Sequence, residues 1–114
     1  MNEKPLYAES NSHALHLEET SRSLCCPLLN RRVNLTRTAY RLCEVLFHER
    51  LLSDERLVRQ VFACSLDTQM KECLDKHIDH LRAKIRVYEW DILRVLRYGY
   101  LLLPHDQVSM DRED

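Results

Sequence analysis

The stretch from residue 68 to residue 103 constrains the fold most, because a long helical pattern is followed there by the pattern of a hairpin. Apolar residues recur every three or four positions, so they share one side of a helix predicted over residues 68–86 and must be buried. They are Leu74, Ile78, Leu81 and Ile85. The other side of this helix is polar and comprises Gln69, Glu72, Cys73, Lys76, His80 and Lys84. A helix of this composition presents hydrogen-bonding groups to a partner outside the protein.

The segment after this helix is predicted to form a two-stranded hairpin. Its first strand begins at Trp90, its turn spans residues 97–99, and its second strand covers residues 100–103. The turn ends at Gly99, the single glycine of the chain. A lone glycine predicts a backbone position at which a Cβ atom would clash, such as a bulge or a close approach of two strands.

Two further helices are predicted upstream. Thr36 is a suitable N-cap for a helix over residues 37–49, since its hydroxyl can accept a hydrogen bond from the first turn. Ser53 marks the start of a helix over residues 54–63, because the carboxylates after it favour the positive end of a helix dipole. The apolar faces of the two helices comprise Ala39, Leu42, Cys43, Leu46 and Phe47, and Leu57, Val58, Val61 and Phe62.

The N-terminal part of the chain is divided by polar turns into three short apolar pieces. They are predicted to be strands over residues 14–17, 23–28 and 32–35. Pro27 restricts the middle strand to an edge or a bulge, because proline donates no hydrogen bond to a ladder.

The 114 residues are enough for one domain with a modest core. We expect this domain to span residues 13–103, with a flexible arm over residues 1–12 and a disordered acidic tail over residues 104–114. The sequence has neither an apolar run long enough to cross a membrane nor a secretory signal. It therefore predicts a cytoplasmic protein that does not associate with membranes.

The five cysteines form no CxxC pair, and their number is odd. This pattern argues against a disulfide framework or a zinc knuckle. Cys43 and Cys64 lie in apolar surroundings and are expected to be small buried residues.

The net charge of −1 hides an uneven distribution. Residues 31–97 contain 14 Lys and Arg against 10 Asp and Glu, whereas both flanking segments are acidic. Nucleic-acid affinity depends on Lys and Arg that contact phosphates. A basic centre is compatible with such binding but does not establish it.

The predicted order is three short strands, three helices and a hairpin. Two helices joined by a short connection, a polar third helix and a final hairpin are typical of a winged helix-turn-helix, an α+β fold. The sequence also resembles the DNA-binding domain of OmpR/PhoB-type response regulators over about residues 14–103. The most specific segments are LT-x-x-x-Y-x-L at 35–42, HI-x-x-LR-x-K-I at 77–85, and the pair Gly99 and Tyr100.

The resemblance implies a small N-terminal antiparallel sheet, a three-helix bundle and a C-terminal β-hairpin wing. It implies that the third helix lies in the major groove of double-stranded DNA and that the wing reaches the adjacent minor groove. Lys76 and His80 would then face base edges, and His77 and Arg82 would hold the DNA backbone. The whole set of expected DNA-binding residues is Thr36, Lys71, Cys73, Lys76, His77, His80, Arg82, Lys84, Arg94 and Arg97.

The sequence departs from the family pattern in three respects. Glu72 and Asp79 place carboxylates on or beside the outer side of the third helix, where phosphate would repel them. The usual R-G-x-G-Y of the wing has lost its first glycine, so Arg97 stands at that position. No receiver domain is present in this sequence, and if Met1 is the native start, phosphorylation of an attached receiver cannot control the protein.

The sequence leaves three alternatives to DNA binding. Cys73, His77 and His80 form a C-x3-H-x2-H pattern that could hold a metal, but no fourth ligand is evident, and neither a metal nor a cofactor is expected. Enzymatic activity is not supported, since no phosphate loop or nucleophile elbow occurs.

The third alternative is a winged-helix module or adaptor that binds protein and has no strong DNA affinity. A continuous basic strip would favour DNA, and a strip interrupted by carboxylates would favour protein. The residues of the strip are Lys71, Lys76, Lys84, Arg94 and Arg97; the interrupting carboxylates would be Glu72, Asp79 and Asp91. A DNA-binding protein is expected to act as a homodimer on DNA and to contact RNA polymerase or another transcription protein.

Overall fold

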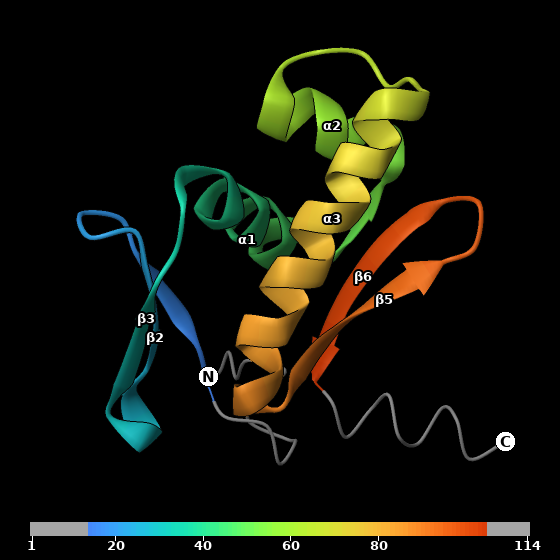
Figure 1. Cartoon of the computed structure of the whole chain (residues 1–114). Coiled ribbons are helices and arrows are strands. Elements are labelled where there is room, and N and C mark those ends of the chain that lie inside the picture. The colour runs from blue at the N-terminus through green and yellow to red at the C-terminus, as the bar shows by residue number, and fades with distance from the viewer. Residues whose placement is uncertain (1–13, 105–114) are drawn as a thin grey trace, which may run out of the picture.

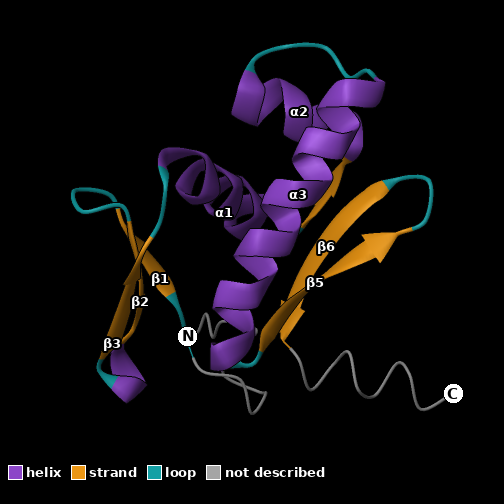
Figure 2. Cartoon of the chain, in the orientation of Figure 1, coloured by secondary structure: helices purple, strands orange, loops and turns teal. Residues whose placement is uncertain are grey.

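The computed structural model describes residues 14–104, so the predicted arm and all of the predicted tail after Pro104 lie outside the described residues. In the described part, three helices lie between an N-terminal and a C-terminal sheet (Figure 1). The α+β fold and its winged helix-turn-helix arrangement are therefore confirmed. Figure 2 shows the N-terminal sheet on one side of the helices and the hairpin on the other.

The N-terminal sheet is antiparallel and has the order β1-β2-β3. Its strands are β1 (His16–Glu18), β2 (Ser23–Cys26) and β3 (Arg31–Asn34). The middle strand ends two residues earlier than predicted, because Pro27 opens a short 3-10 turn, η2 (Pro27–Leu29). Proline fits the first position of such a turn, where its missing N–H has no partner to lose.

The three helices are α1 (Arg37–Glu49), α2 (Asp54–Phe62) and α3 (Thr68–Ile85). Each begins at a side-chain cap: Thr36 accepts from the amide of Ala39, Ser53 from that of Arg56, and Asp67 from that of Met70. The bounds of α1 and the caps at Thr36 and Ser53 agree with the sequence.

Both later helices end one residue before the predicted limit. Ala63 adopts a left-handed conformation with φ 58° and so ends α2. After α3 the chain tightens into a 3-10 turn, η3 (Arg86–Tyr88), which ends at Glu89 with φ 68°. Single left-handed residues are a common way to end a helix.

The C-terminal sheet has one strand more than the sequence predicted. The hairpin strands β5 (Trp90–Val95) and β6 (Gly99–Pro104) pair as expected, although β6 begins one residue earlier and ends one residue later than predicted. A third strand, β4 (Leu51–Ser53), adds to the free edge of β6, giving the order β4-β6-β5. Three residues are too few to show an alternating pattern. The pairing of β4 also depends on a strand that lies almost fifty positions later in the chain.

The hydrophobic core joins both sheets to the helices. The predicted buried face of α3 is confirmed, since Leu74, Ile78, Leu81 and Ile85 are all almost completely buried. Their neighbours in the core include Leu24 of β2, Leu42 and Leu46 of α1, Leu52 of β4, Leu57 of α2 and Ile92 of β5. Apolar packing on the buried side of α3 thus fixes the position of this helix relative to the hairpin.

Gly99 lies where β6 passes very close to β4. A Cβ atom at this position would stand 1.8 Å from the carbonyl oxygen of Leu52 and 2.6 Å from the Cα of Ser53. The predicted close approach is confirmed, and its cause is the strand β4 that the sequence did not reveal.

One prediction about the cysteines is wrong. Cys43 is buried, and desolvation raises the pKa of its thiol from 9.0 to about 12. Cys64 is exposed instead. It follows the left-handed residue that ends α2, so it belongs to the connection between α2 and α3 and not to the apolar face of α2.

Among residues 14–104, no helix is long and apolar enough to cross a membrane.

Candidate nucleic-acid interface

The outer side of α3 is polar and accessible, as its spacing predicted. Lys76 and His80 are exposed, and Cys73 and Lys84 are partly exposed. Asp67 caps the first turn, which holds the N-terminal end of the helix in a defined conformation. The side chains on this face therefore stand on a rigid element.

A hollow of about 450 Å³ lies between the start of α1 and the outer side of α3. It brings together four of the ten predicted DNA-binding residues. It is lined by Thr36, Ala39, His77, His80, Ala83 and Lys84. The Thr36 hydroxyl already accepts the amide of Ala39 at 3.1 Å as the N-cap of α1. The ring of His77 packs against Phe62 of α2, with 5.6 Å between centroids.

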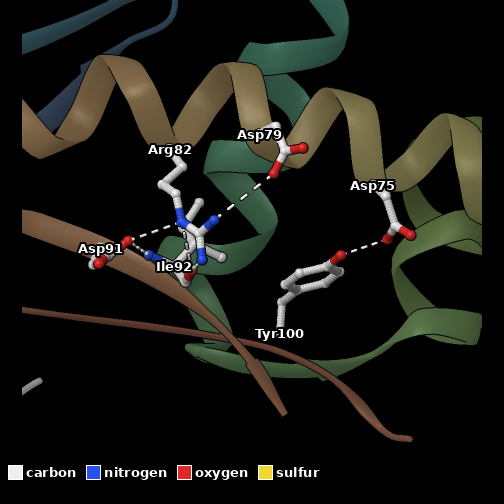
Figure 3. Close-up of polar contacts among 6 residues, drawn as sticks. All are labelled: Asp75, Asp79, Arg82, Asp91, Ile92 and Tyr100. Atoms are coloured by element: carbon white, nitrogen blue, oxygen red, sulfur yellow. Dashed lines mark hydrogen bonds and ion pairs between the residues drawn. The ribbon is translucent and has the colours of Figure 1, made fainter. Parts of the chain in front are cut away.

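Arg82 points from α3 toward the hairpin (Figure 3). Its Nε lies 3.1 Å from the carboxylate of Asp91, and its guanidinium also donates to the carbonyl of Ile92 at 2.8 Å. A longer ion pair of 3.8 Å links it to Asp79. The structure thus gives Arg82 a role in joining α3 to β5.

Lys71 and Arg94 also have partners inside the fold. Arg94 donates to Asp54 at 2.7 Å, and this hydrogen bond raises the pKa of Arg94. Lys71 lies 3.6 Å from Asp75 and 3.9 Å from Asp54. The side chains of Lys71 and Arg94 thus lie at the junction of α2, α3 and the hairpin, away from the hollow beside α1.

Arg97 occupies the tip of the hairpin. The tip is a turn closed by a hydrogen bond from the Tyr98 amide to the Val95 carbonyl at 2.9 Å. Arg97 has φ 63° in this turn, the left-handed conformation that glycine adopts most easily. Its neighbours Leu96 and Tyr98 have exposed side chains, with Leu96 80% accessible.

The cations of the basic strip therefore differ in whether a carboxylate neutralises them. Within residues 14–104, no carboxylate lies within ion-pair distance of Lys76, Lys84 or Arg97, whereas Lys71 and Arg94 are compensated by Asp54 and Asp75.

The acidic residues that were expected to interrupt the strip differ in exposure. Asp91 is 6% accessible and lies beneath the surface. Glu72 is exposed, and the Asp79 side chain is 71% accessible. Two carboxylates, not three, therefore accompany the cations on the outer side of α3.

Sequence reasoning missed the part that Asp54 and Tyr100 play. In the sequence Asp54 is only one of the two carboxylates that follow Ser53, yet its side chain is 9% accessible and faces β5. Tyr100 donates its hydroxyl hydrogen to Asp75 of α3 (Figure 3), and burial followed by this hydrogen bond raises the pKa of Tyr100. The GY pair marked Tyr100, but no spacing in the sequence pairs it with Asp75.

The described residues contain no group of three side chains arranged to hold a metal ion. Within the C-x3-H-x2-H pattern, His77 packs on Phe62 and His80 lines the hollow. The three side chains of the pattern do not converge on one point.

Comparison with known proteins gives a family match. Residues 30–102 match the family model described as transcriptional regulatory protein, C terminal. No curated protein sequence matches the chain.

Solved structures share the fold. The DNA-binding domain of Bacillus subtilis CssR is 19% identical, with 79% of this chain and 100% of that chain covered and a TM-score of 0.66. The C-terminal DNA-binding domain of RstA from Klebsiella pneumoniae is 21% identical, with 92% and 96% covered and a TM-score of 0.60. The AdeR DNA-binding domain, solved in complex with an intercistronic region, is 18% identical, with 77% and 91% covered and a TM-score of 0.59.

Proposed function

Because the chain belongs to the family of C-terminal domains of transcriptional regulatory proteins, we propose that it regulates transcription by binding double-stranded DNA. Helix α3 would enter the major groove, and the β5–β6 hairpin would act as the wing. The proposal rests above all on the outer side of α3, where Lys76, His80 and Lys84 are accessible and no carboxylate among residues 14–104 lies within ion-pair distance of them. An α-helix fits the width of the major groove.

The accessible residues divide into two roles. Lys76 lies in the middle of the outer side and can donate to the O6 and N7 atoms of guanine. Lys84, near the C-terminal end of α3, and Thr36 and His77 at the hollow are suited to the phosphates that run along the edge of the groove. Arg97 at the wing tip would supply a further positive charge to the adjacent minor groove.

A single small module buries too little surface for tight specific binding. We therefore propose that two copies bind neighbouring half-sites. A contact with RNA polymerase or another transcription protein would then couple DNA binding to transcription.

Selection from random double-stranded DNA, followed by titration with salt, tests the proposal. One sequence motif should be enriched, and the logarithm of the binding constant should fall linearly with the logarithm of salt concentration, because phosphate contacts release counterions. Absence of both an enriched motif and a salt dependence would contradict DNA binding.

One observation favours a second function, a protein-binding winged-helix module. Glu72 and Asp79 are exposed on the same helix as the cations, and Lys71 and Arg94 are already compensated. In that case the selection would return no motif. Neutralising Glu72 and Asp79 together would then weaken capture of a basic protein partner, whereas the same change strengthens binding to DNA.

A further inference from the structure

Five side chains from four elements form a closed ring at the junction of the helices and the wing. Asp54 of α2 accepts from Arg94 of β5 at 2.7 Å, and the Arg94 guanidinium lies over the ring of Tyr100 of β6, 5.0 Å from its centroid. Tyr100 donates to Asp75 of α3, Asp75 lies 3.6 Å from Lys71, and Lys71 lies 3.9 Å from Asp54. We call this set the junction ring.

The junction ring is supplemented by backbone contacts at the base of the wing tip. The amide of Asp54 donates to the carbonyl of Tyr98 at 2.8 Å, which ties the first residue of α2 to the wing turn. The close approach of Gly99 to Leu52 holds the start of β6 against β4. The part of the wing next to its tip is thus attached to the start of α2 and to β4.

The links of the junction ring differ in strength. The Asp54 side chain is 9% accessible and that of Arg94 is 30% accessible, so this ion pair is shielded from solvent. Tyr100 is also buried, at 6% accessible. Lys71 and Asp75 are each 41% accessible, and exposed ion pairs contribute little. The firm links are therefore Arg94 to Asp54 and Tyr100 to Asp75.

The two firm links connect different pairs of elements. Arg94 to Asp54 joins the wing to α2, and Tyr100 to Asp75 joins it to α3 (Figure 3). The formal charges of the four ionised members cancel, so the junction ring adds no net charge to the surface. Its geometry suits it to hold the wing at a fixed distance and angle from α3.

We infer that the junction ring acts as a strut that orients the wing for binding the same DNA as α3, with Asp54 and Tyr100 as positioning residues. This inference rests on the proposed DNA binding. A wing that is already oriented adds its contacts without a further loss of conformational entropy. Without the strut, Arg97 would contribute less to DNA binding, whereas the contacts of α3 with DNA would remain.

Tyr100→Phe opens the junction ring with almost no change in volume, and Tyr98→Phe removes a hydroxyl from the same hairpin outside the ring. Arg97→Ala should weaken binding to the selected DNA by about tenfold in the wild-type background and by less than about threefold with Tyr100→Phe. Its effect with Tyr98→Phe should equal that in the wild type. Lys76→Ala should weaken binding by the same factor in all three backgrounds.

General destabilisation of the fold would not give this pattern. A lower folded fraction weakens binding by the same factor whether Arg97 or Lys76 is substituted, so it would not reduce the effect of Arg97→Ala alone. If the effect of Arg97→Ala is the same with Tyr100→Phe as in the wild type, the strut is wrong although DNA binding stands. Asp75→Ala opens the same link from the helix side. Asp79→Ala, four positions further along α3, is its control: it changes DNA binding itself, but the effect of Arg97→Ala measured in its background should equal that in the wild type. This second pair decides the question if Tyr100→Phe does not fold.

If the wild-type chain binds no DNA, the proposed function fails, and the strut is then judged by backbone dynamics alone. The NMR order parameters of residues 96–99 should fall in Tyr100→Phe and stay at wild-type values in Tyr98→Phe. Unchanged order parameters in Tyr100→Phe would overturn the inference.

Discussion

Arg82 of α3 and Asp91 of β5 form a hydrogen-bonded ion pair of 3.1 Å whose acidic partner is almost completely buried. The same guanidinium caps the carbonyl of Ile92 at 2.8 Å. The pair joins the C-terminal half of the proposed recognition helix to the first strand of the wing, at the opposite end of α3 from Lys71 and Asp75. Arg82 therefore belongs to the structural frame of the proposed interface.

Arg82→Ala should lower the free energy of unfolding by about 2 kcal/mol, because it removes a charge-assisted hydrogen bond to the buried Asp91 and the hydrogen bonds to the Ile92 carbonyl. Urea titration followed by circular dichroism measures the change. Lys84→Ala is the matched control two positions along α3 and should stay within about 0.5 kcal/mol of wild type. Equal effects of the two substitutions would show that the Arg82 pair contributes no special stability.

Gly99→Ala should destabilise the protein by about 3 kcal/mol or more. The added methyl would meet the Leu52 carbonyl oxygen and the Ser53 Cα, and backbone atoms cannot turn aside as a flexible side chain would. Chemical denaturation gives the loss, with Leu96→Ala in the same hairpin as a nearly neutral control. A Gly99→Ala protein as stable as the wild type would mean that β4 does not approach β6 as closely as described.

Local patterns predicted the helices well because each contains its own signals. The 3.6-residue periodicity of α3 and the caps at Thr36 and Ser53 are encoded within a few neighbouring residues. Their positions depend little on the rest of the chain, so sequence alone was sufficient.

Long-range partners could not be predicted in this way. Strand β4 exists because β6 lies beside it, and Asp54 is buried because Arg94, forty positions later, reaches it. For the same reason Arg82 and Arg94 looked like free cations in the sequence. The resemblance indicated which positions matter, but only the packed structure shows that these two arginines have acidic partners inside the fold.

Arg97→Gly should raise the free energy of unfolding by about 1 kcal/mol while it weakens DNA binding. Glycine relieves the cost of φ 63°, but the substitution removes the positive charge at the wing tip. Arg97→Ala separates the two effects: alanine keeps the backbone strain, so binding should fall equally without the gain in stability. Thermal unfolding measures the stability of both variants, and DNA titration measures their binding. A stability gain in Arg97→Ala, or unequal losses of binding in the two variants, would contradict the prediction.

Stability should decline in alkali, starting above about pH 9. Burial raises the pKa of Cys43 from 9.0 to about 12, so the folded state holds its proton more tightly than the unfolded state. This contribution is fully present below pH 9 and is lost as pH rises toward 12, amounting to about 1.4 kcal/mol by pH 10. The pKa of Tyr100 is also raised, from 10.0, and adds to the decline at higher pH.

Urea titrations at pH 8, 9 and 10 test this expectation with wild type and Cys43→Ala. The variant should be less stable at pH 8, because it leaves a small cavity, but its stability should change little between pH 8 and pH 9, and it should decline less than wild type at pH 10. A decline of the same size and onset in both proteins would exclude Cys43 as its cause.

Lys76→Ala should weaken binding to the selected DNA by about 1 to 3 kcal/mol and relax the preference for one base pair, if Lys76 donates to a guanine. Lys84→Ala should instead weaken binding to all sequences alike and reduce the salt dependence by about one counterion, as expected for a phosphate contact. Glu72→Gln serves as the charge control on the same helix: removal of an exposed carboxylate near the phosphates should strengthen binding without altering the selected motif. Competition titrations against single-base variants of the motif separate the three outcomes, and an unaltered base preference in Lys76→Ala would remove this lysine from the set that reads sequence.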